Sequence, residues 1–543
     1  MIKLQDALRH AADRPDHIAL IDGGRRITWS ELTDEIAKVA GGLSKIIPAG
    51  RPARAAFLAC NGWELVVAMA ACETIGLPIT GLDFEAGPEA TAAALEQLRP
   101  TVVFSTKLHR PLLIAAGWAD REGVLQVHLH GVGEELAAPE PIVFEPSAGE
   151  PVSYATLAAT QSPVTTPCDQ PYESLALTYE VDGPPRLVVR AGSVERRRLA
   201  DLADEFALDE DDIYLVTVPM YHASSPSWAR IFFALGGTVV LGPYHDLAEM
   251  ARLIVDEGVT ATLIVPPTLS RLLSHPDSAE LRVASRLRYV FSGGRHLNRW
   301  IVNEAWERLG PVLHLYYGTT ETGLITMITP DELHVASCRS GRALPGTTIA
   351  ILDPLDRPVP IGVRGRVAVA GYQLMDSYGS TPAPAVLVDL GDQQGPRRFL
   401  LTGDNGVIDY DGRLEVTGRT GGVPKVQVDG ERDAAVFGLE ADLLSQPSIR
   451  DAAVLRLDLP EYGDALAVAF VPVAPDREAA GHRSIEAACA RRVPWLRTHT
   501  VAVDEIPYSP TGKIRTRELT ARVLPLISLN VHLDQQYAKE VPA

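Results

Sequence analysis

The feature that most limits the fold of this chain is a series of short apolar runs that alternate with segments of helical periodicity. The runs at 213–218, 261–265 and 289–291 are rich in β-branched and aromatic residues and fit buried strands. The segment 246–257 between them has the pattern of a helix. Strands that alternate with helices pair in parallel, because each helix carries the chain back across the sheet. We therefore expect an α/β fold with helix-covered parallel sheets.

The start of one helix can be placed from its capping residues. Thr28 and Glu31 have the spacing of a capping box, in which each side chain accepts a hydrogen bond from the backbone N–H of the other residue. Leu32, Ile36 and Val39 follow at helical spacing. The segment is therefore expected to be an amphipathic helix that packs one apolar face against the core.

From residue 349 the pattern changes to short strands joined by tight turns, with little sign of helix. This change indicates a β-rich subdomain at about 340–418, which completes an N-terminal domain spanning 1–418. Three glycines at 418, 421 and 422 reduce the backbone restriction and favour a hinge, which we assign to Gly421. Residues 419–543 are then a small C-terminal α+β domain, with strands and one helix expected at 452–457, 465–471 and about 485–492.

Length, charge and cysteine content exclude several classes of protein. A chain of 543 residues predicts roughly three or four compact units, and 46% hydrophobic with 22% charged residues is the balance of a globular protein. A net charge of −19 argues against nucleic acid as a partner. The five cysteines have no metal-binding spacing, which indicates reduced thiols in a cytoplasmic protein. Charged and polar residues interrupt the most apolar stretch, so no membrane segment is expected.

The strongest functional signal is a set of short motifs between residues 292 and 513. They are Ser-Gly-Gly at 292–294, Tyr-Tyr-Gly-Thr-Thr-Glu at 316–321, Thr-Gly-Asp at 402–404, Gly-Arg at 418–419 and Ser-Pro-Thr-Gly-Lys at 509–513. In this order and at these separations they resemble the motifs of the adenylate-forming superfamily, which includes acyl-CoA synthetases, adenylation domains of peptide synthetases, amide ligases and luciferases. The resemblance extends nearly from end to end. It implies ATP or AMP and Mg²⁺ as cofactors, an N-terminal domain of two helix-covered sheets, and a mobile C-terminal lid.

The resemblance implies catalytic roles for three residues. Making an acyl adenylate brings a carboxylate against the α-phosphate of ATP, so cations and oriented donors must surround two anions. By the resemblance, Thr320 offers its hydroxyl to the α-phosphate and Glu321 offers its carboxylate to Mg²⁺. Lys513 is delivered by the lid and neutralises charge at the reacting groups when the site is closed.

Further residues are expected to hold the nucleotide. Gly293 and Gly294 end an apolar strand, where the absence of side chains lets a flat purine approach the backbone, and Arg295 follows them directly. By the resemblance, Tyr317 would pack on adenine, and Gly318 beside it would belong to the same nucleotide-binding motif. Asp404 would accept hydrogen bonds from both ribose hydroxyls, and Arg419 would be the hinge arginine near the ribose and the phosphate.

The acid substrate is expected to lack an α-amino group. Residues 218–223 resemble the segment whose histidine or aromatic residue gates the acyl pocket in acyl-CoA synthetases, and His222 is the candidate. Amino-acid-activating domains place an aspartate at about this position to pair with the α-ammonium, and this chain has none there. A small-molecule aryl or alkyl carboxylic acid is therefore the expected substrate.

One motif departs from the family pattern. Relatives hold the β- and γ-phosphates with small Ser, Thr and Gly residues whose N–H groups and hydroxyls converge on them. Here the corresponding loop runs from Thr178 to Gly183 and contains Glu180 and Asp182. A like-charge contact at roughly 5 Å costs on the order of 3 kcal/mol at an effective dielectric constant near 20, so the loop is poorly suited to phosphate.

Two interpretations follow from this loop. Either it has changed in an enzyme that still uses ATP, or the site receives an acyl adenylate or acyl thioester made elsewhere, as an acyltransferase or a binding protein. We favour the first, because Glu321 and Lys513 serve the adenylation step. The residues after the hinge also differ from those of thioester-forming relatives, with Pro424 and Val428 in the region that lines the pantetheine tunnel. The acyl acceptor is therefore either a thiol, of CoA or a carrier protein, or an amine.

Overall fold

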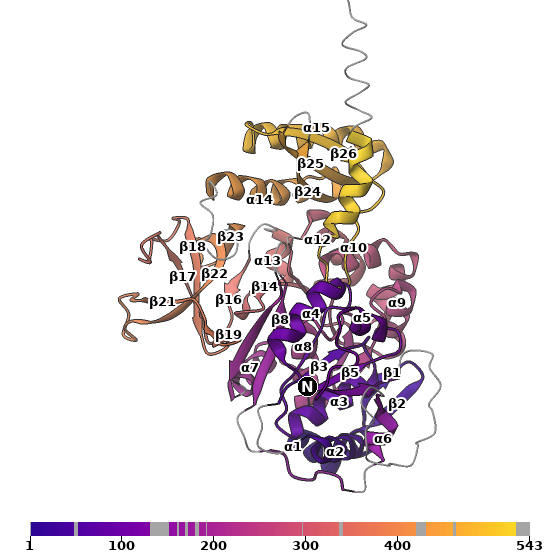
Figure 1. Cartoon of the computed structure of the whole chain (residues 1–543). Helices are drawn as coiled ribbons and strands as arrows, with labels where there is room; N and C mark the ends of the chain where they lie inside the picture. Colours follow the sequence, from indigo (N-terminus) through magenta and orange to yellow (C-terminus); the bar gives the residue numbers. More distant parts are fainter. Residues whose placement is uncertain are drawn as a thin grey trace, which may run out of the picture.

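The computed structural model combines a large body, built on two α/β sheets and a β-rich part, with a smaller C-terminal unit (Figure 1). It describes residues 2–47, 53–130, 151–159, 162–168, 172–179, 184–191, 193–295, 297–335, 340–419, 430–459 and 463–527. No helix in these ranges combines the length and the apolar character that crossing a bilayer requires.

The largest sheet has nine strands among the described residues, and its five central strands pair in parallel. The order across the sheet is β16 (Arg342–Ala343), β15 (Gly323–Ile328), β14 (Leu313–Thr319), β13 (Tyr289–Gly293), β12 (Ala261–Leu263), β10 (Ile213–Val216), β11 (Thr238–Leu241), β1 (Ile18–Asp22) and β2 (Arg25–Thr28). The helices that connect the central strands are α8 (Ser224–Leu235), α9 (Leu247–Asp256), α10 (Pro266–Ser274) and α12 (Arg299–Leu309). The expected alternation of strands and helices is confirmed.

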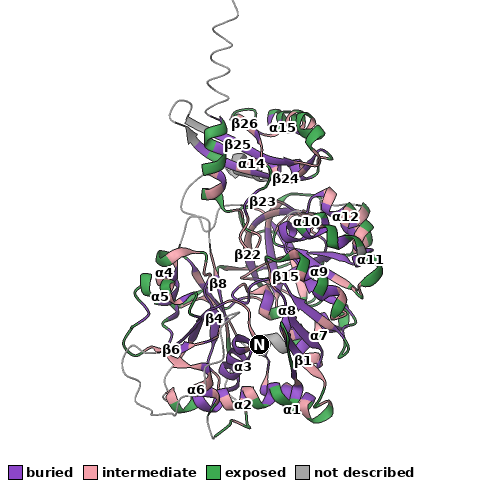
Figure 2. Ribbon diagram, turned by 90° about the vertical axis from the view of Figure 1, so that its right-hand side faces the viewer, coloured by how far each residue is buried: buried purple, intermediate pink, exposed green. Residues whose placement is uncertain are grey.

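A second, parallel sheet of five strands stands beside the first. Its order is β4 (Ile79–Gly81), β3 (Ala55–Leu58), β5 (Val102–Ser105), β6 (Leu125–His128) and β7 (Val152–Ser153). Helix α3 (Trp63–Thr74) is buried at every position from Glu64 onward. Its apolar residues share one core with strands of both sheets, which explains why it has no polar face (Figure 2). The predicted helix after residue 28 is α2 (Trp29–Ile46), and both hydrogen bonds of its capping box are present.

The β-rich part consists of two sheets, and no helix is present in the described residues 340–419. The first contains β17 (Thr347–Leu352), β18 (Gly365–Gly371), β22 (Arg397–Ile408) and β21 (Ala385–Val388), with β23 (Leu414–Arg419) paired to β22. The second joins β8 (Glu173–Thr178) and β9 (Arg186–Ala191) to β19 (Ser377–Tyr378) and β20 (Thr381–Pro382). Residues that follow the expected phosphate loop therefore lie beside residues almost 200 positions further along the chain.

The C-terminal unit is a three-stranded sheet with helices on its faces. It comprises α14 (Gly430–Leu444), β24 (Ile449–Leu459), β25 (Gly463–Pro472), α15 (Glu478–Arg492) and β26 (Arg497–Ala502). In Figure 1 it lies above α10 and α12 of the body. The hinge residue Gly421 and the division near residue 420 fall outside the described residues, and the domain boundaries stay a prediction.

Candidate active site

The turn between β14 and β15 carries the two residues expected to serve the α-phosphate and Mg²⁺. Thr319 and Thr322 close it, since each backbone N–H donates to the other side chain, at 3.1 and 3.2 Å. Gly318 is required here because a Cβ atom at this position would lie 2.2 Å from the Gly323 carbonyl oxygen. The tight turn leaves Thr320 and Glu321 partly accessible at the edge of the largest sheet.

Glu321 is held in place from the β-rich part. The Tyr378 hydroxyl donates to Glu321 Oε1 at 2.9 Å, and the Met375 N–H donates to the Glu321 carbonyl at 2.9 Å. The guanidinium of Arg186 stacks 3.3 Å above the Tyr378 ring. No group of three or more His, Cys, Asp or Glu side chains suited to a metal occurs among the described residues. A single carboxylate nevertheless fits Mg²⁺, which takes most of its ligands from phosphate and water in nucleotide sites.

The structure brings together two of the expected nucleotide contacts. Tyr317 on β14 donates its hydroxyl proton to Asp404 Oδ2 on β22, at 2.6 Å, and Asp404 is only 6% exposed. The Thr402 hydroxyl accepts from the Asp404 N–H at 3.1 Å and fixes the turn of the strand. Arg419 pairs with Asp404 through its backbone, and its side chain is not described.

The two glycines at the end of β13 have different surroundings. A Cβ atom on Gly293 would lie 2.7 Å from the ring of Tyr316, so this ring packs directly on the backbone. Gly294 has a φ of +84°, and a Cβ atom there would meet nothing within 4 Å. The side of the strand that Gly294 faces is therefore open to a flat ligand.

Lys513 lies at the body although it belongs to the C-terminal part of the chain. Its Nζ donates to the Tyr179 carbonyl at 3.3 Å and stands 5.8 Å from the centre of the Tyr179 ring. Two residues later, Arg515 pairs with Glu85 of the body at 2.6 Å. Gly512 has a φ of +81° in the turn before the lysine and would meet Val265 if it carried a Cβ atom. The lysine turn is thus docked at the start of the expected phosphate loop.

The expected phosphate loop is described only at its first two residues. Thr178 ends β8, and Glu180, Asp182 and Gly183 lie outside the described residues. The Tyr179 hydroxyl accepts from the Asp83 N–H at 3.1 Å, and burial raises the pKa of this phenol. Tyr179 therefore packs as a neutral aromatic residue where relatives are expected to have a small one.

His222 belongs to the same region as the lysine. Its Nδ1 lies 2.7 Å from the Ser224 hydroxyl. Burial, with a smaller contribution from the charge of Lys513, lowers the pKa of the imidazole to about 4. His222 is therefore neutral at physiological pH.

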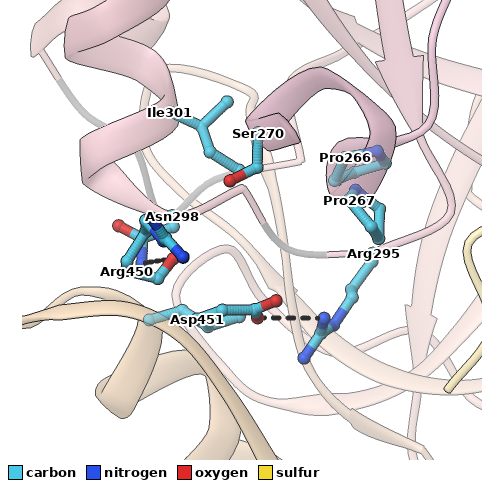
Figure 3. A pocket seen from close by; sticks show the side chains of 9 residues that line it. Pro266, Pro267, Ser270, Arg295, Asn298, Ile301, Arg450 and Asp451 are labelled. Carbon is cyan, nitrogen blue, oxygen red and sulfur yellow. Dashed lines mark hydrogen bonds and ion pairs between the residues drawn. The ribbon is translucent and has the colours of Figure 1, made fainter. Parts of the chain in front are cut away.

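Arg295 lies at the interface with the C-terminal unit. Its guanidinium pairs with Glu440 at 2.7 Å and with Asp451 at 3.3 Å, and it donates to the Tyr508 hydroxyl. Nearby, the Asn298 amide donates to the Ile449 carbonyl at 2.7 Å. Figure 3 shows the shallow pocket between the two parts, with Arg295 directed towards Asp451. The side chain of Arg295 is thus engaged with the C-terminal unit, and its contact with nucleotide stays a prediction.

Replacing Arg295 by alanine is expected to weaken the docking of the lid. The change leaves two carboxylates at the interface without their cation, which costs about 3 kcal/mol for a largely buried pair. Small-angle X-ray scattering should then show a larger radius of gyration and a broader distance distribution. The matched control is Arg299→Ala, whose guanidinium donates to the Leu333 and His334 carbonyls within the body. Equal scattering by wild type and Arg295→Ala contradicts the docking role.

Two arginines and a tyrosine of this site were not predicted as a group. Arg190 on β9 donates to the Thr320 carbonyl, Tyr378 contacts Glu321, and Arg186 stacks on Tyr378. The available signal was a charged residue at the end of the apolar run 187–189, directly after the altered phosphate loop. An arginine after an apolar run is typical of the end of a strand, so this pattern alone does not indicate a functional cation.

Comparison with known proteins found a matching protein family and several relatives of similar length. Residues 8–179 and 186–379 match the family described as AMP-binding enzyme. The gap between the two matched segments coincides with the part of the phosphate loop that carries Glu180 and Asp182. An indoleacetate–CoA ligase of Aromatoleum aromaticum is 26% identical over 530 residues, which cover 95% of this chain and 97% of that protein. A 2-succinylbenzoate–CoA ligase of Bacillus licheniformis is 27% identical over 517 residues, covering 93% of this chain and 97% of that protein.

Solved structures share the fold over nearly the whole chain. The amide bond synthetase McbA from Marinactinospora thermotolerans has a TM-score of 0.72 at 23% identity, covering 96% of this chain and 99% of that one. The o-succinylbenzoate CoA synthetase of Bacillus subtilis, in complex with its acyl-adenylate intermediate, has a TM-score of 0.71 at 21% identity, with 96% and 98% covered. At these identities the likeness shows the fold.

Proposed function

The chain belongs to the family of AMP-binding enzymes, and from this premise we propose that it is an acid ligase that forms an acyl adenylate from a carboxylic acid, ATP and Mg²⁺. The acyl group then passes to a thiol or an amine. The observation that carries the proposal is the position of Lys513. A residue more than 300 positions beyond Tyr179 brings its ammonium to 3.3 Å from the carbonyl at the start of the phosphate loop, in the region of His222.

The reaction assigns one role to each part of the site. Tyr317 and Asp404 hold the adenosine, and the Thr320 hydroxyl donates to an α-phosphate oxygen. The acid's carboxylate oxygen attacks the α-phosphorus, the bond from that phosphorus to the bridging oxygen breaks, and pyrophosphate leaves. Lys513 stabilises the charge that develops between the two anions. Glu321 would hold Mg²⁺, which would supply neutralisation of phosphate charge when bound. In the second step the acceptor's sulfur or nitrogen attacks the acyl carbon and AMP leaves.

The acid is proposed to be uncharged apart from its carboxylate, and aromatic acids are the first to test. The candidate at position 222 is a histidine, and an imidazole in either protonation state carries no negative charge to pair with an α-ammonium group. The relatives include ligases named for indoleacetate, 4-coumarate and 2-succinylbenzoate, and a salicylyl-CoA synthase. We expect an aryl acid to be preferred over an α-amino acid, because the ammonium group of the latter would be repelled by the nearby ammonium group of Lys513.

Pyrophosphate exchange into ATP is the direct test. Radiolabelled pyrophosphate should enter ATP only when a cognate acid is present, and a panel of aryl, alkyl and amino acids identifies that acid. CoA and simple amines added separately then show which acceptor consumes the adenylate. An absence of exchange with every acid of the panel would count against the proposal.

A second candidate function rests on the altered loop. Tyr179 is packed against the body, and two acidic residues follow it, so the site of the β- and γ-phosphates is unlike that of a small-residue loop. In this alternative the protein takes a preformed acyl adenylate or acyl thioester and does not use ATP. Calorimetric titration separates the two functions: ATP and AMP both bind in the first, whereas AMP binds and ATP does not in the second.

A further inference from the structure

Arg190 lies on the strand that follows the phosphate loop, on the face that looks towards the catalytic turn. Side chains alternate along β9, and Leu187 and Val189 pack into the core of the second sheet. Arg186, Val188 and Arg190 share the opposite face, where Val188 packs against Met375 of the β-rich part. The two arginines of this face therefore flank the segment that holds Glu321.

The guanidinium of Arg190 donates hydrogen bonds to two backbone carbonyl groups. Nη2 donates to the Thr320 carbonyl, and Nε donates to the Gln373 carbonyl at 3.0 Å. No Asp or Glu oxygen of the described residues pairs with it directly, and Glu321 and Asp376 act on it only as nearby charges. Burial lowers the pKa of Arg190 to about 10, so it remains a cation at neutral pH.

A partly buried guanidinium bound only by carbonyl groups among the described residues lowers the stability of the fold, so we ask what its charge or its hydrogen-bond donors contribute to function. Arg190 is partly buried, so its guanidinium loses part of its hydration without a directly paired carboxylate among the described residues, and this carries a desolvation penalty. The Thr320 carbonyl is the backbone group between the two catalytic side chains, and the Glu321 carbonyl accepts from Met375. Fixing both carbonyls sets the direction in which Thr320 and Glu321 point.

We propose that Arg190 is a positioning residue for the turn at Thr320 and Glu321, and that its charge supplies part of the positive potential that the loop with Glu180 and Asp182 does not provide. This inference rests on the proposed function. Arg190 acts through Thr320 and Glu321, which face the α-phosphate and the metal. Arg190 and Arg186 on β9, together with Tyr378 on the neighbouring β19, therefore hold the segment that carries Glu321, the proposed metal ligand.

The test compares Arg190→Leu with a matched variant, Arg198→Leu. Arg198 also donates to two carbonyls, of Pro345 at 3.0 Å and of Leu324 at 2.6 Å, but it holds the strand beyond the turn. In Arg190→Leu we expect the Mg²⁺ concentration for half-maximal exchange to rise about tenfold and kcat to fall about thirtyfold, as for loss of a residue that orients a metal ligand. The KM for the acid should stay within about twofold, since the acyl pocket is untouched. Arg190→Lys should recover part of the loss because it restores the charge.

Binding of AMP by calorimetry supplies a readout that does not depend on turnover. The Kd for AMP should rise about tenfold in Arg190→Leu and stay within about twofold in Arg198→Leu, because only the first change releases the Thr320 carbonyl. If wild type catalyses no exchange, the proposed function fails while the AMP comparison still decides on Arg190. A folded Arg190→Leu with wild-type AMP affinity and Mg²⁺ dependence overturns the proposal, and so do equal losses in the two variants. If Arg190→Leu does not fold, Arg190→Lys with wild-type values in both measurements also overturns it.

Discussion

Replacing Lys513 by alanine is expected to lower the rate of acyl-adenylate formation by about a thousandfold, because the change removes a charge donor that acts on the transition state. The ammonium donates to the Tyr179 carbonyl, at the start of the proposed phosphate loop, and the Lys513 side chain is exposed enough to move towards a bound substrate. Pyrophosphate exchange measures this step. Hydrolysis or transfer starting from a synthetic acyl adenylate should change far less, because the lysine serves the first step.

Two variants make this result specific to position 513. Arg517→Ala removes a cation from the exposed surface four residues away and should keep nearly full exchange activity. Lys513→Arg retains the charge but not the compact ammonium, so it should recover only part of the rate. Exchange in Lys513→Ala above about one tenth of the wild-type rate contradicts the role proposed for the lysine.

Replacing Glu321 by glutamine is expected to lower exchange by about a hundredfold and to raise the Mg²⁺ requirement, since the amide keeps the shape of the side chain but not its charge. The Tyr378 hydroxyl can still donate to the amide oxygen, so the turn should remain folded. The measurement is exchange rate against Mg²⁺ concentration, with thermal melting to verify the fold.

The control for Glu321 is Glu332→Gln. Glu332 pairs with Arg413 at 3.1 Å and with Arg342 at 3.5 Å, away from the Thr320 turn, so its loss removes a carboxylate without touching the site. We expect no change in the Mg²⁺ requirement of this variant. An unchanged requirement in Glu321→Gln as well would assign the metal to other ligands.

Much of the α/β framework was predictable because local patterns determine it. The apolar runs at 213–218, 261–265 and 289–291 correspond to β10, β12 and β13, and the capping box placed the start of α2. The meeting of Tyr317 with Asp404 agrees with the residues that the family resemblance selected, although their roles towards nucleotide stay predictions. These features depend on periodicity or on short motifs, and both can be recognised in a single sequence.

The contacts that hold the turn at Thr320 and Glu321 could not be predicted from the sequence, and the reason is physical. Arg190 reaches Thr320 across 130 residues, and Tyr378 reaches Glu321 because β19 pairs with β9. Nothing in the local sequence of either residue specifies this pairing. The docking of the lid is similar, since Arg295 meets Glu440 and Tyr508 across 145 and 213 residues. Contacts of this kind are set by the packing of whole domains.

The hydrogen bond between Tyr317 and Asp404 spans two layers of the protein, because Tyr317 belongs to the nine-stranded sheet and Asp404 to the β-rich part. A nucleotide that contacts both residues, as we propose, would bridge the two layers. Occupancy at one hundred times the Kd adds about 2.7 kcal/mol to the stability of the folded form. Under the proposed function, we therefore expect the thermal stability of this protein to rise with the concentration of its nucleotide.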